Sequence, residues 1–168
     1  EKKSFNVNPI YESTLKGTTF EEYNKYMDDY FKVYNDIESL EYDFKTVEEK
    51  IKSLKIAIDN TPRKAKELVL DFYNLKNSFL SMKIKVLGNE SKMEIGEKNP
   101  PSLINRIRVA SQGLSSSYGP TKLHLESLDM ARQIYQELKS DFDVLISKAV
   151  NTLENKIKTS GGPLIIED

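Results

Sequence analysis

The sequence predicts an all-α fold, an antiparallel three-layer helical bundle made of a long helix, a broken middle layer and a second long helix, with a short extended N-terminal segment. Apolar residues recur at steps of three and four over most of the 168 residues, as they do on one face of a helix. Interruptions rich in Gly, Pro, Asn or Ser, near 59–61, 88–101 and 115–120, separate the periodic segments.

Residues 1–17 are predicted to be an extended linker or the last strand of an upstream β-domain. Phe5 and Val7 alternate with polar residues, and Pro9 closes this strand-like pattern. Because the chain begins at Glu1 rather than Met, we expect a processed product or an excised piece from which any signal peptide is already missing.

The first long helix is predicted to begin at Thr18, with Thr18 as N-cap and Glu21 as its capping-box partner. At 1.5 Å per residue, a helix of about 40 residues is roughly 60 Å long. Its apolar stripe comprises Phe20, Tyr23, Met27, Tyr30, Tyr34, Ile37, Leu40, Phe44, Val47, Ile51, Leu54 and Ile58.

A second helix is expected after the break at 59–61, with Thr61 as N-cap and Pro62 at the first helical position. It stops at Gly88, and residues 88–101 are predicted to form a loop because they are rich in Gly, Asn, Ser and Pro. The stripe of this helix comprises Ala65, Leu68, Phe72, Leu75, Phe79, Met82 and Val86.

A short helix over 102–114 and a final long helix complete the predicted bundle, which spans residues 18–160 and ends in a tail at 161–168. The second and short helices together are about as long as either long helix, which predicts a middle layer broken at the 88–101 loop. The direction of the short helix is left open. The short helix has the stripe Leu103, Ile107, Ala110 and Leu114, and the final helix has Leu128, Ala131, Tyr135, Leu138, Phe142, Leu145, Ala149, Leu153 and Ile157. The expected centre of the core is Phe44, Leu75, Phe79, Leu138, Phe142 and Leu145.

Composition excludes several classes of function. With 25 Lys+Arg against 26 Asp+Glu, the net charge of −1 provides no long-range attraction to nucleic acid or anionic lipid. There is no Cys for a disulfide or a thiolate, and no apolar run approaches the ~20 residues that span a bilayer. A single histidine, His124, leaves histidine metal sites and charge-relay systems without ligands. We therefore expect no enzyme, no catalytic residues, no metal and no cofactor.

The turn before the final helix is the candidate contact site. Serine hydroxyls and the unpaired N–H groups of a helix start can meet the acceptors of a partner. The alternative is a tight helix–helix turn that Tyr118 staples to the core, with His124 as a packed or capping residue. The candidate contact residues are Ser116, Tyr118, Gly119, Pro120, Thr121 and His124.

Two stretches carry a resemblance to a known family: residues 99–107, NPPSLINRI, and residues 114–121, LSSSYGPT. Over 99–128 the chain resembles the C-terminal helical region of bacterial sortilin-like, BNR-repeat β-propeller proteins, often labelled glycosyl hydrolases. It departs from that family at Gly162-Pro163-Leu164, where the family has Gly-Ala or Gly-Pro followed by Trp. The resemblance implies an accessory module, since the family's hydrolytic role would reside in the propeller.

The predicted function is a non-catalytic C-terminal interaction module of a larger exported propeller-type protein, in the bacterial periplasm, at the outer membrane or outside the cell. Its partner is expected to be a protein, either its own upstream propeller or β-domain or an envelope protein. The alternative is a ligand-binding helical sensor domain of a periplasmic receptor, and a third is an enzyme with unrecognised chemistry. A buried polar pocket would favour the sensor, whereas a dry core with an exposed apolar strip would favour the contact module. The oligomeric state is left open.

Overall fold

The computed structural model describes residues 2–6, 16–62 and 66–163, of which 78% are helical and none are in strands. The predicted all-α bundle is confirmed. Residues 2–6 have no regular structure, and the rest of the expected strand, residues 7–10, lies outside the described residues. The helices are α1 (Phe20–Asp59), α2 (Lys66–Leu87), α3 (Glu90–Glu94), α4 (Leu103–Ser111), α5 (Lys122–Val144) and α6 (Asn151–Thr159).

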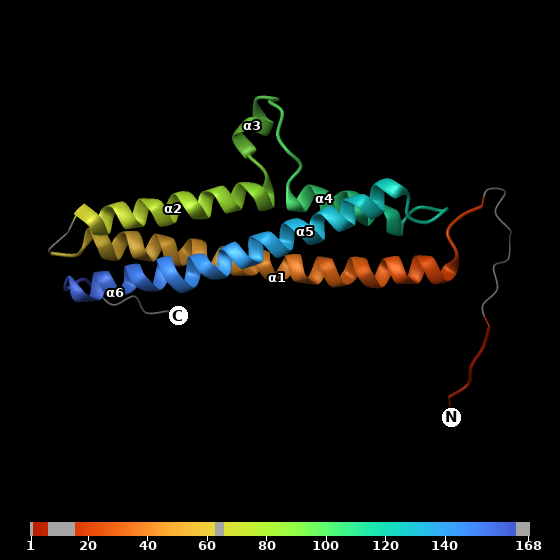
Figure 1. Ribbon diagram of the computed structural model, residues 1–168, viewed down its shortest axis with the longest axis horizontal. Helices are drawn as coiled ribbons and strands as arrows, with labels where there is room; N and C mark the ends of the chain where they lie inside the picture. Colours follow the sequence, from red (N-terminus) through yellow and green to blue (C-terminus); the bar gives the residue numbers. More distant parts are fainter. Residues whose placement is uncertain (1, 7–15, 63–65, 164–168) are drawn as a thin grey trace.

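The helices lie lengthwise along an elongated molecule (Figure 1). The chain runs along the bundle in α1, returns in α2 and α4, and runs back in α5 and α6. α4 follows α2 in the same row, which settles the direction of the short helix. α3 projects from the bundle between them, so the predicted 88–101 loop contains a short helix that the sequence analysis did not predict. Asn89 begins it by accepting a hydrogen bond from the Lys92 N–H.

The predicted core is confirmed. Phe44, Leu75, Phe79, Leu138, Phe142 and Leu145 are all buried in one cluster. Phe142 is fully buried, and its ring stacks on Phe44 with 4.5 Å between the ring centroids. The centroid of the Phe79 ring lies 5.3 Å from that of the Phe44 ring, so α1, α2 and α5 each contribute one aromatic ring. Aromatic pairs at such distances stabilise a core beyond the area they bury.

The stripe of α1 differs from the prediction at its start. Phe20 is 81% exposed, while Tyr26 and Val33, which the sequence analysis did not assign to the stripe, are buried. Phe20 is the first residue of α1, and the facing chain bonds to Thr18 before the helix begins. The buried face therefore opens about one turn later than expected. The predicted stripe residue Ala65 lies outside the described residues.

The last helix contains a π-helical segment, η2 (Leu145–Val150), between α5 and α6. The predicted stripe steps from Leu145 to Ala149, but the structure buries Val150 completely and leaves Ala149 partly exposed. A π turn closes its hydrogen bond over five residues, so Val150 returns to the face of Leu145 one turn later. This extra residue realigns the stripe with Leu153 and Ile157, which are buried.

The start of α1 corrects the expected cap of the first helix. The N-cap of α1 is Thr19 rather than Thr18, and its partner is Glu22 rather than Glu21. The Thr19 N–H donates to Glu22 at 2.9 Å, and the Glu22 N–H donates to the Thr19 hydroxyl at 3.2 Å. Thr61 is bonded to the end of α1, where its hydroxyl donates to the Ala57 carbonyl at 2.8 Å. The predicted start at Thr61-Pro62 leads into residues 63–65, outside the described residues, and the described part of α2 begins at Lys66.

The far C-terminal end is closed as predicted. The Gly161 N–H donates to Lys158 and the Gly162 N–H to Ile157, while Gly161 has a φ of +75°. These two hydrogen bonds, together with the left-handed Gly161, form a Schellman motif, which satisfies the last carbonyls of a helix.

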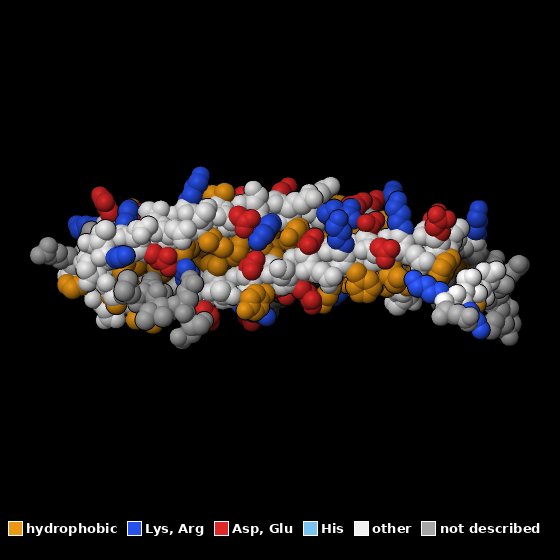
Figure 2. Space-filling view, turned by 90° about the horizontal axis from the view of Figure 1, so that it is seen from below, with side chains coloured by type: hydrophobic (Ala, Val, Ile, Leu, Met, Phe, Trp, Pro, Cys, Tyr) orange, Lys and Arg blue, Asp and Glu red, His pale blue; other side chains and the backbone are white. Residues whose placement is uncertain are grey.

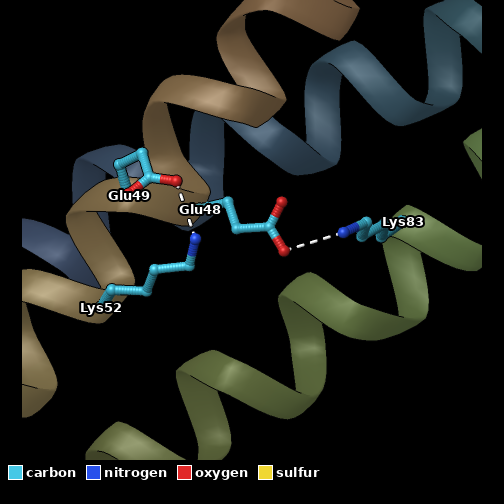
Figure 3. A network of polar contacts seen from close by, with 4 residues as sticks. All are labelled: Glu48, Glu49, Lys52 and Lys83. Atoms are coloured by element: carbon cyan, nitrogen blue, oxygen red, sulfur yellow. Dashed lines mark hydrogen bonds and ion pairs between the residues drawn. The ribbon is translucent and has the colours of Figure 1, made fainter.

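Ion pairs link the helices at the surface. Figure 3 shows Glu48 of α1 extending to Lys83 of α2, at 2.7 Å, while Lys52 pairs with Glu49 within α1. Lys139 of α5 reaches Asp43 of α1 at 3.2 Å. Exposed pairs of this kind contribute little stability, about 0–1 kcal/mol each. The inter-helix pairs place a basic side chain of one helix beside an acidic side chain of its neighbour.

Candidate contact site at the Tyr118 end

The Tyr118 end of the bundle consists of residues 16–20 and 112–124. Here the chain leaves α4 through a 3₁₀ turn, η1 (Gln112–Leu114), and enters α5 next to the start of α1. The Tyr118 carbonyl accepts hydrogen bonds from the Thr18 N–H at 2.9 Å and from the Thr18 hydroxyl at 3.1 Å. The turn is also closed by the Gly119 N–H, which donates to the Ser116 carbonyl at 3.0 Å. Two segments 100 residues apart are thereby joined.

Gly119 is required at its position for two reasons. Its φ is +84°, the left-handed region that favours glycine. A β-carbon here would also lie within 2.5 Å of the Thr18 β-carbon and overlap the Thr18 hydroxyl. The close approach of the turn to Thr18 therefore depends on the absence of a side chain.

His124 caps the start of α5. Its Nδ1 accepts a hydrogen bond from the Thr121 N–H at 3.1 Å, which gives it the place that Glu or Gln holds in a usual capping box. Thr121 is therefore the N-cap, and Pro120 directly precedes it. The bond requires an unprotonated Nδ1. The capping alternative for His124 is confirmed.

Two tyrosines of α1 secure the end of α4. The Tyr23 hydroxyl donates to the Leu114 carbonyl at 2.8 Å, and the Tyr26 hydroxyl donates to the Ala110 carbonyl at 2.6 Å. Both bonds reach carbonyls at the C-terminal end of α4 and of the 3₁₀ turn that follows it. The predicted stripe contained Tyr23 without a polar role and omitted Tyr26, because periodicity does not indicate what a hydroxyl at the stripe edge reaches.

The raised pKa of the Tyr26 phenol predicts that the protein loses stability at alkaline pH. Burial, with a smaller contribution from Tyr30, raises the pKa of the Tyr26 phenol from 10.0 to about 12. Folding therefore favours the protonated phenol, so its contribution is complete below pH 10 and is lost as the pH rises toward 12. Urea midpoints measured between pH 8 and 11.5 should fall more steeply for the wild type than for Tyr26→Phe. Parallel pH profiles would contradict this prediction.

A pocket of about 880 Å³ opens at the Tyr118 end. Among the candidate contact residues, Ser116, Tyr118 and Gly119 line it, whereas Pro120, Thr121 and His124 do not. Tyr118 is 47% exposed, so its ring does not join the core, and its carbonyl rather than its ring ties the turn to the bundle. Phe5 and Phe20, which were not among the candidate contact residues, also line the pocket and are largely exposed.

Among the described residues there is neither a three-ligand metal site nor a membrane-spanning helix. Within 2–6, 16–62 and 66–163 no group of three His, Cys, Asp or Glu side chains is arranged to hold a metal ion. No described helix combines the length and apolar character needed to cross a bilayer.

Comparisons with family models, with curated proteins and with solved structures find no match to this chain. The resemblance to the sortilin-like propeller proteins therefore stays a prediction.

Proposed function

We propose that this chain is a non-catalytic protein-contact module, the helical accessory region of a larger exported propeller-type protein that acts in the bacterial envelope or outside the cell. Its partner is a protein, either its own upstream propeller or β-domain or an envelope protein. The partner docks at the Tyr118 end.

The proposal is supported by the small number of polar side chains that are buried between the described helices. In the described part of the chain the buried polar residues are Thr61 after α1, Ser102 just before α4 and Ser127 within α5. Thr61 is bonded to the end of α1, and the Ser102 hydroxyl caps α4 by accepting from the Asn105 N–H at 3.2 Å. Such scattered groups do not form the polar chamber that a small-molecule sensor needs between its helices. Recognition at the surface is therefore favoured over the sensor.

The Tyr118 end has the features of a docking surface. Phe5, Phe20 and Tyr118 surround a pocket whose floor includes the hydrogen-bonded turn at Gly119. Exposed aromatic residues are enriched in protein interfaces and supply large contact area at low entropy cost. Elsewhere, much of the visible flank in Figure 2 carries interspersed acidic and basic side chains, a pattern that serves solubility.

Tyr118→Ala is expected to weaken binding to the upstream part of the parent protein at least about 10-fold, as removal of an interface aromatic does. The upstream part is identified from the coding sequence before Glu1, and binding is measured by calorimetry. Thermal stability should hardly change because the ring is exposed. Tyr42→Ala is the matched control, since Tyr42 is 72% exposed on α1.

Equal affinities of the wild type and Tyr118→Ala would refute docking at this end. Stabilisation of the isolated chain by a small molecule, with no protein bound, would instead favour the sensor.

A further inference from the structure

The pocket at the Tyr118 end is lined by uncharged residues. None of the described residues that line it is Asp, Glu, Lys or Arg, although these four types make up 30% of the chain. A phosphate, a carboxylate or an ammonium group that entered the pocket would give up part of its hydration without meeting an opposite charge. The lining therefore favours an uncharged ligand over an ionic one.

Aromatic side chains reach this pocket from three separate segments. Phe5 lies in the N-terminal segment, Phe20 is the first residue of α1, and Tyr118 belongs to the turn before α5. The three side chains are 84%, 81% and 47% exposed, so their ring surface is available to a partner. Grooves lined by several aromatic rings are the sites that proline-rich segments occupy in other peptide-binding modules.

The backbone carbonyls of the turn are largely in use as acceptors. Three of them accept hydrogen bonds from within the chain: Leu114 from the Tyr23 hydroxyl, Ser116 from the Gly119 N–H, and Tyr118 from the N–H and the hydroxyl of Thr18. A ligand that brings many N–H or O–H donors would find these acceptors occupied, and an unpaired donor at a binding surface weakens binding.

Two hydroxyls of the same turn are unused donors. Ser116 and Ser117 both line the pocket, and their hydroxyls have no hydrogen-bond partner within the described part of the chain. The neighbouring Ser115 differs, since its hydroxyl donates to the Gln112 carbonyl at 3.2 Å. The pocket thus places free donors beside carbonyls that are already bonded, which suits a ligand rich in acceptors and poor in donors.

A proline-rich peptide segment has this chemistry. Each proline provides a carbonyl acceptor and no N–H donor, and its ring is an uncharged apolar surface. In the polyproline II conformation the carbonyls make no internal hydrogen bonds and remain free to accept from a partner. The conformation exists before binding, so little entropy is lost on docking. An extended strand or a sugar, by contrast, brings an N–H or O–H donor with nearly every unit.

We propose that the Tyr118 end binds an uncharged, proline-rich segment of the partner protein in the polyproline II conformation. The proline rings pack against Phe5, Phe20 and Tyr118, and the segment's carbonyls accept hydrogen bonds from the Ser116 and Ser117 hydroxyls. The proposal rests on the proposed contact function and names the kind of segment that docks there.

A synthetic octamer of proline, titrated into the chain and followed by the amide signals of the Tyr118 end in NMR spectra, tests the proposal. We expect saturable binding with a dissociation constant below about 1 mM and shifts centred on Ser116, Ser117 and Gly119. A Gly-Ser octamer, which is uncharged but flexible and rich in N–H donors, should not bind in this range. Maltotetraose, an uncharged sugar, should not bind either.

Two variants with matched controls test the named contacts. Tyr118→Ala and the double variant Ser116→Ala/Ser117→Ala should each weaken binding of the proline octamer about 5- to 10-fold, with unchanged circular dichroism. Tyr42→Ala and Ser53→Ala remove the same groups from exposed positions on α1 and should bind like the wild type.

Absence of octamer binding at about 1 mM, or equal binding of the octamer by the double serine variant and the wild type, would overturn the proposal. Equally tight binding of the Gly-Ser octamer or of maltotetraose would overturn it too. If Tyr118→Ala weakens binding of the upstream part while the octamer does not bind, the protein contact stands and the proline-rich segment is wrong. If the octamer binds while the upstream part ignores Tyr118→Ala, the proline-rich segment stands and docking of the upstream part is wrong.

Discussion

Phe142→Ala is expected to lower the free energy of unfolding by about 3–5 kcal/mol, a large part of the stability of a small domain. Phe142 is fully buried and stacks on Phe44, which in turn contacts Phe79. Truncation removes the apolar transfer energy and leaves a cavity where three helices meet. Urea unfolding followed by circular dichroism measures the loss.

Phe20→Ala is the matched control, since the same atoms are removed from a side chain that is 81% exposed. Its urea midpoint should remain close to that of the wild type. Equal midpoints for Phe142→Ala and the wild type would show that the Phe142 ring does not support the core.

Gly119→Ala is expected to cost about 1–3 kcal/mol from the left-handed backbone alone, and more from the overlap with Thr18. The new β-carbon would push the turn away from Thr18 and break the two hydrogen bonds that Thr18 donates to the Tyr118 carbonyl. Thermal unfolding should show the loss, and amide hydrogen exchange should show reduced protection at Thr18.

Two comparisons separate the causes. Gly96→Ala also places alanine at a positive φ, +70°, but its β-carbon would meet nothing within 4 Å, so it measures backbone strain alone. Adding Thr18→Gly removes the overlapping atoms, and the double-mutant cycle should recover part of the loss. Equal costs for Gly96→Ala and Gly119→Ala, without coupling to Thr18, would show that the close approach is unimportant.

The sequence alone determined the fold class and the centre of the core. Apolar steps of three and four place Phe44, Phe79 and Phe142 on helix faces, and burial of those faces is the main driving force for folding. The end of α2 at Gly88 also followed from local chemistry, because glycine adopts a positive φ, here +94°, without steric cost. Capping by His124 was one of the stated alternatives, and its partner Thr121 lies only three residues earlier in the chain.

Only the tertiary structure decided features that depend on distant segments. Thr18 and Thr19 each have a glutamate three residues later, and the contact of Thr18 with Tyr118, 100 residues away, leaves Thr19 as the cap. The pocket at the Tyr118 end depends on the same non-local contact. Likewise, α2 has apolar residues outside its predicted stripe, and only its packing against the bundle shows that Leu70, Tyr73 and Ile84 stay exposed.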